Sequence, residues 1–198
     1  MPSSTPSPRF RAAGAIGAIV LTALALPACT TTLPESHPTA SNARESSNAQ
    51  VDAALSKLYN TVPGSRELVG RSAGVLVFPS VVGTSLVVGA EHGRGELRVG
   101  NRTQGYYSTT AASIGWQAGA QSKAVIYVFT TSEALAKFRS SNGWTVGADA
   151  TVAVAHIGAN GSIDTTSFSK PVVGFVLTNV GLEAGVSLQG ATITPVTP

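Results

Sequence analysis

The sequence predicts a β-dominated α+β fold. We expect a curved antiparallel sheet that closes into a barrel-like or sandwich body, with N-terminal helices and one helix near residues 132–140. Three observations predict it. Helical spacing of apolar residues is confined to short segments, short β-branched runs separated by turn residues follow Ala73, and 21 glycines favour a bent sheet. The spacing leaves the choice between barrel and sandwich open.

Residues 1–28 have the composition of an export signal. Arg9 and Arg11 precede the uncharged run AAGAIGAIVLTALAL. A membrane-spanning helix needs about 20 apolar residues, and this run is shorter. A basic start followed by a short apolar run is typical of a leader that is cleaved during export.

The only cysteine of the chain, Cys29, directly follows this leader. The stretch LPAC, residues 26–29, resembles the bacterial lipobox, in which the chain is cut before a diacylated cysteine. The resemblance implies a lipoprotein attached to membrane lipid through N-acyl diacylglyceryl Cys29, with a plain cleaved signal as the alternative. Threonines after the cysteine favour an outer-membrane lipoprotein that faces the periplasm, and exposure on the cell surface stays open.

Residues 29–48 comprise the acylated cysteine and a segment rich in Ser, Thr, Pro and Asn. Such a segment buries too little apolar surface to order itself, so we expect a flexible tether, followed by one domain at residues 49–196. Removing Arg9 and Arg11 reduces the 13 basic residues to eleven, against ten acidic ones. This near-neutral balance argues against a nucleic-acid partner.

Apolar residues recur at helical spacing at the start of the domain and predict an amphipathic helix over 49–61, ended by Pro63-Gly64. Ser65 is expected to cap a second short helix, SRELVGR. The stripe of the first helix consists of Val51, Leu55, Leu58 and Val62.

A third helix is predicted over residues 132–140, SEALAKFRS. Ser132 is expected to cap it, Glu133 lies in its first turn, and Leu135 and Phe138 share one face. The preceding run AVIYVF lacks polar alternation, so we expect this strand to be covered on both faces, partly by this helix.

Short β-branched segments predict the strands of the sheet, and their short connections predict antiparallel neighbours. Turns are expected at 101–105, 160–161 and 179–181. The predicted strands are GVLVF (74–78), TSLVVGA (84–90), GELRV (95–99), SIGWQAGA (113–120), KAVIYVF (123–129), WTVGADATVAVAHI (144–157), VVGFVL (172–177) and LEAGVSLQGATI (182–193).

The domain offers few groups for catalysis. It has two histidines, His92 and His156, and no nucleophile-elbow, nucleotide-binding or metal-ligand motif. Glu91 and His92 are neighbours on a strand and should point to opposite faces. We therefore expect no enzyme, no metal and no cofactor, and a hydrolase using one of the histidines is the third hypothesis.

Basic residues form two groups. Arg94, Glu96 and Arg98 share one face of a predicted strand, which indicates either a solvated sheet edge or a site for an anionic headgroup. Arg66 and Arg71 flank the second helix.

The strand residues resemble the SYLF domain, also called the Ysc-type actin-binding domain. The most specific parts are GWQAG (115–119) and AGVSL (184–188). The whole resemblance consists of AGVLVFPSVV (73–82), GYYSTTAASIGWQAGAQSKAVIYVFTTSEALAKF (105–138), GWTVGADATVAVAHIGANGSID (143–164) and GLEAGVSLQGA (181–191).

This resemblance implies a domain that binds membrane lipid, such as phospholipid or a phosphoinositide-like molecule. Actin binding is not expected of an exported protein. The alternative is a non-enzymatic structural or interaction lipoprotein with a protein partner in the envelope. The candidate lipid-binding residues are Trp116 and Gln117 in the pocket wall and Arg66, Arg71 and Arg94 as headgroup contacts.

Overall fold

The computed structural model describes residues 40–85, 88–114, 120–155, 163, 169–183 and 187–197. The chain divides into a unit at Met1–Ser36 and a unit at His37–Pro198, and every described residue belongs to the second. Its helices are α1 (Ala40–Thr61), α2 (Ser65–Arg71) and α3 (Ser132–Ser140). Its strands are β1 (Gly74–Ser85), β2 (Val88–Val99), β3 (Arg102–Ile114), β4 (Ala120–Phe129), β5 (Trp144–Thr145), β6 (Ala153–Val154), β7 (Val172–Thr178), β8 (Gly181–Leu182) and β9 (Thr192–Val196).

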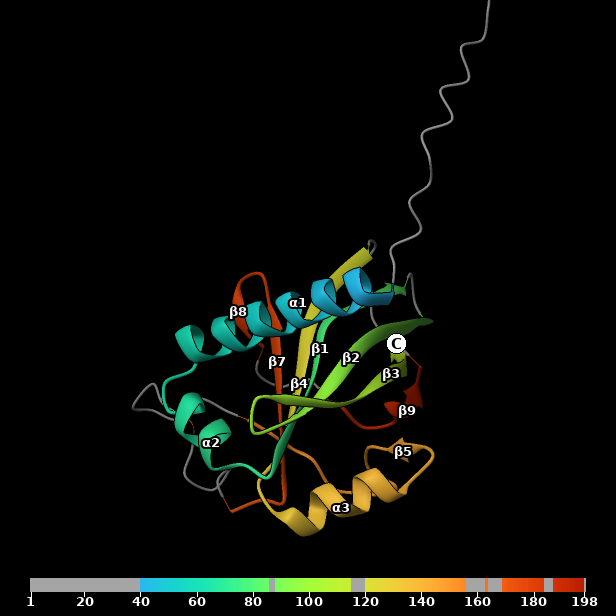
Figure 1. Ribbon diagram of the computed structural model, residues 1–198. Helices are drawn as coiled ribbons and strands as arrows, with labels where there is room; N and C mark the ends of the chain where they lie inside the picture. Colours follow the sequence, from blue (N-terminus) through green and yellow to red (C-terminus); the bar gives the residue numbers. More distant parts are fainter. Residues whose placement is uncertain are drawn as a thin grey trace, which may run out of the picture. The chain divides into compact units, whose positions relative to one another are not determined.

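The described strands form one curled sheet, a half-barrel (Figure 1), in the order β5-β9-β3-β2-β1-β4-β7-β6, with β8 paired to β7 beside this path. The predicted β-dominated α+β fold is confirmed, in its barrel-like form. One neighbouring pair differs from the prediction, because β6 runs parallel to β7. The connection over residues 155–171 is long enough to return the chain to the same end of the sheet.

The sheet is buried on both faces at its centre. Side chains of β4 alternate between two hydrophobic clusters: Val125, Tyr127 and Phe129 belong to one, and Ala124 and Ile126 belong to the other. This arrangement explains the unbroken apolar run AVIYVF and confirms that both of its faces are covered.

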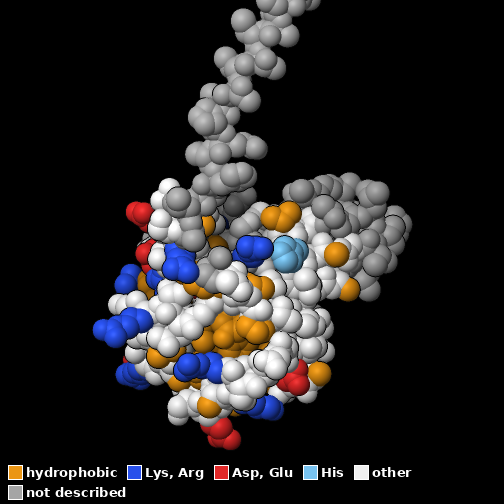
Figure 2. Space-filling view, turned by 45° about the vertical axis from the view of Figure 1, so that its right-hand side comes forward, with side chains coloured by type: hydrophobic (Ala, Val, Ile, Leu, Met, Phe, Trp, Pro, Cys, Tyr) orange, Lys and Arg blue, Asp and Glu red, His pale blue; other side chains and the backbone are white. Residues whose placement is uncertain are grey.

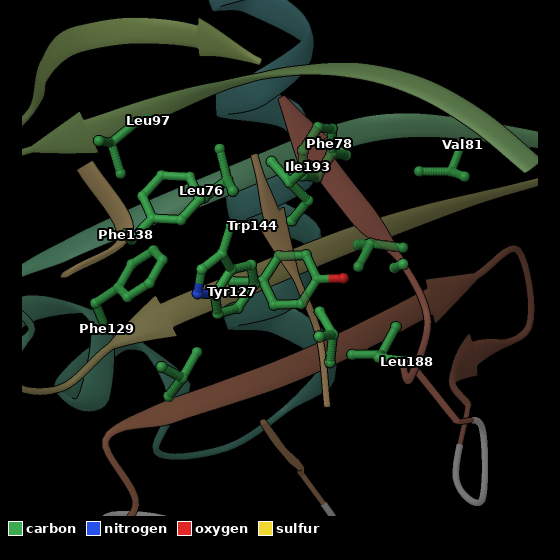
Figure 3. Close-up of a cluster of buried hydrophobic side chains, with 14 of the residues drawn as sticks. Leu76, Phe78, Val81, Leu97, Tyr127, Phe129, Phe138, Trp144, Leu188 and Ile193 are labelled. Atoms are coloured by element: carbon green, nitrogen blue, oxygen red, sulfur yellow. The ribbon is translucent and has the colours of Figure 1, made fainter. Parts of the chain in front are cut away.

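The first cluster lies between the sheet and α3 and is rich in aromatic rings (Figure 3). Trp144 meets Tyr127 and Phe138 edge to face, with ring centroids 5.9 and 5.4 Å apart. Phe138 and Leu135 are both buried on α3, as their shared face predicts. Rings in such geometry stabilise the core beyond the area that they bury.

The second cluster lies between the sheet and α1, which runs along the opposite side from α3 (Figure 1). Val51, Leu58 and Val62 are fully buried and Leu55 packs partly against them, so the predicted stripe is confirmed. The helix nevertheless starts at Ala40, and the prediction of a flexible tether is wrong for residues 40–48. Once a helix has formed, each added residue gains a backbone hydrogen bond at little cost, so polar residues can extend it without an apolar stripe.

Both predicted serine caps are wrong by one residue. The N-cap of α3 is Thr131, whose hydroxyl accepts a hydrogen bond from the backbone N–H of Ala134. The N-cap of α2 is Gly64, and Ser65 is buried. The Ser65 hydroxyl bonds back to the carbonyl of Val62 at 2.6 Å, so it ties α2 to the end of α1.

Strand β1 continues past Pro79, beyond Phe78, the last residue of the predicted strand GVLVF. The pairing of β1 with β2 shifts between Val77 and Ser80. Proline has no N–H to donate to a neighbouring strand, and it is tolerated at such a bulge because the bulged residue is left unpaired. Gly95 lies against this bulge. A Cβ on Gly95 would be 2.1 Å from the carbonyl oxygen of Val77, so no larger residue fits without a shift of the backbone.

Other predicted bounds are also wrong. The predicted strand 95–99 is only the end of β2, and β3 occupies most of the predicted turn at 101–105 and ends inside the predicted strand 113–120. Strand β1 ends and β2 begins inside the predicted strand 84–90. Of the predicted strand 144–157, the described part, 144–155, contains only the strands β5 and β6, because a turn follows Val146 at Gly147, whose φ is 92°. Among the described residues of the predicted strand 182–193, which are 182–183 and 187–193, only the two ends belong to strands.

Candidate functional site

A groove of about 390 Å³ lies between the first half of α1 and the sheet. It forms because this half of the helix carries polar residues and alanines instead of the apolar stripe that packs the second half against the sheet. Ligand sites in proteins commonly have volumes of about 300–1,000 Å³, so the groove can hold one small headgroup. Its walls are Asn42, Ala43, Arg44, Ser46, Ser47 and Gln50 of α1, Pro79, Arg94, Gly95, Tyr106 and Tyr107 of the sheet, and Val196 and Thr197.

Two arginines face this groove from different elements, Arg44 from α1 and Arg94 from β2. Both are exposed, and within the described part of the chain neither makes an ion pair. A guanidinium presents donors in a planar fork that matches phosphate or carboxylate oxygens. The groove is therefore suited to an anionic group.

Beside the groove, a third arginine joins the sheet to α1. Arg98 donates from Nε and Nη2 to Oε1 of Glu96, both at 2.7 Å, and from Nη1 to Oδ1 of Asp52 on α1. Its Nη2 also reaches the backbone oxygen of Asn48 at 3.1 Å. Burial by itself lowers the pKa of Arg98, but the bonds and charges of Asp52 and Glu96 outweigh it and raise the pKa above its ordinary value.

This cluster corrects one prediction and confirms another. β2 lies between β3 and β1, and Glu96 is fully buried, so the interpretation of these charges as a solvated sheet edge is wrong. Glu96 and Arg98 do share a face, as their spacing predicts. The second carboxylate oxygen of Glu96 is buried without a hydrogen-bond partner among the described residues.

The structure separates the arginines that were predicted to contact a headgroup. Arg94 lines the groove, but Arg66 and Arg71 lie on α2 and do not. Arg66 is placed over the ring of Tyr59, 4.3 Å from its centroid, and Arg71 forms an exposed ion pair with Glu67. Burial raises the pKa of Tyr59, and Arg66 and Arg98 partly oppose that shift.

Several other predicted residues lie outside the described part of the chain. These are the lipidation residue Cys29, the pocket-wall residues Trp116 and Gln117, and His156.

His92 and Glu91 are not arranged as a base and its orienting carboxylate. His92 is exposed, whereas Glu91 is half-buried and accepts a hydrogen bond from Lys123 at 2.9 Å. Among the described residues, no cluster of three or more His, Cys, Asp or Glu could hold a metal ion. Of the described helices, none is long and apolar enough to cross a membrane.

The sequence prediction missed Arg44, Asn48 and Tyr106. Arg44 and Asn48 were assigned to the tether, since only apolar periodicity was used to define the helix, although ASNARESSNAQ contains good helix formers such as Ala, Arg, Glu and Gln. Tyr106 lies directly across from Glu96 in the β2–β3 pair. No local pattern marks that juxtaposition.

Figure 2 brings forward the side on which β2, β3 and β9 lie in Figure 1. Hydrophobic side chains gather at the centre of this face, and Lys and Arg side chains lie around them. An apolar centre bordered by cations is the surface composition expected of a domain that meets an anionic, partly apolar partner. The structure is thus a β-dominated α+β domain with a groove between α1 and the sheet.

Comparison with known families gives a match to the C-terminal part of this domain. Residues 110–197 match the family Ysc84, described as "Las17-binding protein actin regulator". This match confirms, for these residues, the resemblance to the SYLF family that the sequence shows. The matched segment includes β4, α3 and β7, while α1, β1 and β2 precede it. No curated protein matches the chain.

Proposed function

We propose that this domain binds the phosphate-bearing headgroup of an anionic phospholipid in the groove between α1 and the sheet. The observation that carries the proposal is the pair Arg44 and Arg94, which face one groove without ion-pair partners in the described residues. Pro79 and Val196 in the same walls offer apolar contact to the glycerol and the first methylenes. The resemblance to SYLF domains, which implies membrane-lipid binding, supports the same ligand class.

The proposed function has no catalytic step. The described walls of the groove contain no His, Cys, Asp, Glu or Lys that could act as a base beside their hydroxyl groups, so the proposal assigns them to binding alone. The family description refers to Las17 and actin regulation. We do not extend that activity to this chain, because the predicted export signal would separate the domain from cytoplasmic actin.

We also propose that the protein is a lipoprotein held by acylated Cys29 at the outer membrane, facing the periplasm. Its support is the order of basic start, apolar run and LPAC in residues 1–29. Each buried methylene contributes about 0.8 kcal/mol to membrane attachment, so acyl chains would dominate anchoring. The groove would add a weaker, headgroup-specific contact.

Headgroup binding can be measured on the full-length chain in non-ionic detergent, by titration calorimetry with dihexanoyl phosphatidylglycerol. A hydrogen bond to a charged group contributes about 1.5–3 kcal/mol, so Arg44→Gln and Arg94→Gln should each weaken binding by about tenfold or more. Arg71→Gln removes the same charge outside the groove and is the matched control. Equal losses in all three variants would show only general charge attraction, and unchanged affinity in the groove variants would refute the proposal.

The anchor is tested separately in cells. Cys29→Ser should release the protein from the membrane fraction, and intact-mass spectra of the unsubstituted protein should show acyl groups on its first residue. A chain that keeps its leader, or an unmodified thiol at Cys29, would contradict the lipoprotein proposal.

A protein partner in the envelope is the second candidate. It is favoured by the filled interior, since the described core side chains pack into two clusters and leave recognition to the surface. A photocrosslinker at Arg44 decides between the two. Crosslinks to one protein, with no affinity for the short-chain lipid, would favour the partner.

A further inference from the structure

The start of α1 is attached to the sheet differently from the rest of the helix. No side chain between residues 41 and 50 is buried, and the apolar contacts of the helix begin at Val51. Asn48 instead makes polar contacts: its backbone oxygen accepts from Arg98 and its side-chain oxygen accepts from Thr103 at 3.3 Å. These bonds fix the first turns of α1 against β2 and β3.

Arg98 therefore connects the two walls of the groove. Asn48 lies one helical turn after Arg44 on the same face of α1, a rise of about 6 Å. Arg94 lies on the same strand as Arg98 and precedes it by four residues, about 13 Å. A bond network that fixes Asn48 relative to β2 thus also fixes Arg44 relative to Arg94.

Glu96 holds Arg98 in this position. Two nitrogens of Arg98 converge on Oε1 of Glu96, which is fully buried beneath the helix. Stability alone does not explain an ion pair here, because apolar residues in place of a buried pair are often neutral or stabilising. The planar guanidinium, in contrast, is oriented by two bonds to one oxygen and can then reach Asp52 and Asn48.

We propose that Arg98, oriented by Glu96, is a positioning residue of the headgroup site: it fixes the start of α1 and so keeps Arg44 facing the groove that Arg94 lines. The inference rests on the proposed function for the ligand, but its structural part can be measured without any ligand.

The test uses the full-length chain in non-ionic detergent with Cys29→Ser, so that spin labels attach only at Glu45→Cys and Ala136→Cys. Both positions are exposed, one on α1 and one on α3. The labelled chain without further substitutions should give one narrow distribution of distances between the two spin labels. Arg98→Lys keeps the charge but lacks the planar fork, and it should broaden the distribution. Glu96→Gln keeps the size and an acceptor oxygen, so it should fold and broaden the distribution less.

Affinity for dihexanoyl phosphatidylglycerol supplies the second measurement. Arg98→Lys should weaken binding by about tenfold, and combining it with Arg44→Gln should weaken binding no further than Arg44→Gln alone, because Arg98 acts through Arg44. If the double variant instead loses affinity by the product of the two single losses, the inference is overturned. A distribution that stays narrow in both variants would overturn it too, whether or not the lipid binds. Absence of lipid binding to the unsubstituted chain, with a broadened distribution in the variants, would refute the proposed function and leave the positioning role supported.

Discussion

Gly95→Ala provides a quantitative test of the bulge that shapes the sheet. The added Cβ would lie 2.1 Å from the carbonyl oxygen of Val77, 2.8 Å from its carbonyl carbon and 2.7 Å from Cδ1 of Phe78. Two of these three atoms are backbone, and Phe78 is fully buried, so no flexible side-chain end can move aside. The strand pair must separate locally or the bulge must reorganise.

The expected cost follows from this geometry. Inserting a methylene into a packed core destabilises proteins by about 1–3 kcal/mol, and occasionally by more. Because the clash is with backbone, we expect at least the upper end, about 3 kcal/mol. A domain has a total stability of about 5–15 kcal/mol, so the variant should remain folded at low temperature but melt clearly earlier.

Denaturant titration followed by tryptophan fluorescence measures this loss, since Trp144 is buried in the cluster to which Phe78 belongs. Gly70→Ala is the matched control. Gly70 lies inside α2, with no atom within 4 Å of the added Cβ, so the change should stabilise the protein by up to about 1 kcal/mol. A Gly95→Ala loss below about 1 kcal/mol, or equal effects of the two substitutions, would refute the reasoning about the bulge.

Three further outcomes are expected. Arg98→Met should lower the free energy of unfolding by about 3–5 kcal/mol in denaturant titrations, because Glu96 stays buried without its cation. Adding Glu96→Met should recover most of that loss. Equal losses in the single and the double variant would contradict this expectation. Thr131→Ala should cost about 1 kcal/mol in the same assay through the lost cap of α3, whereas Ser132→Ala should cost less. Burial, with a smaller effect of Glu91, raises the pKa of Tyr127, so the folded state keeps a proton that the unfolded state loses above about pH 10. Stability should therefore fall as the pH rises through 10, and Tyr127→Phe should reduce that slope; an unchanged slope would show that other groups cause it.

Local patterns predicted the elements that are stabilised by burial along one stripe or run. The face of α1 from Val51 to Val62, the two-sided burial of AVIYVF and the pair Leu135 and Phe138 were all recognised from spacing. Local spacing can predict these features because the period of the backbone decides which side chains face the core.

Features that depend on contacts between distant residues were not predictable. Strand β1 passes Pro79 because Gly95 leaves room for the bulge, and the parallel pairing of β6 with β7 depends on where the intervening chain returns. The cap of α3 was wrong by one residue because the neighbours Thr131 and Ser132 can both serve as a cap, and the cap of α2 was wrong because Gly64 takes this position while the Ser65 hydroxyl bonds back to Val62.

The sequence by itself predicted the fold class and the resemblance to the SYLF family, since composition, periodicity and local motifs carry that information, and the export-type leader stays a prediction. Only the tertiary structure decided the candidate site. It brings Arg44, which was assigned to the tether, to the groove that Arg94 lines. It also buries Glu96, on a strand for which the alternation left a solvated edge or a headgroup site open. The physical reason is that the environment of a charge depends on which segments lie above it, and residues 46 or more positions apart, such as Asp52 and Arg98, meet only once the sheet has curled under α1.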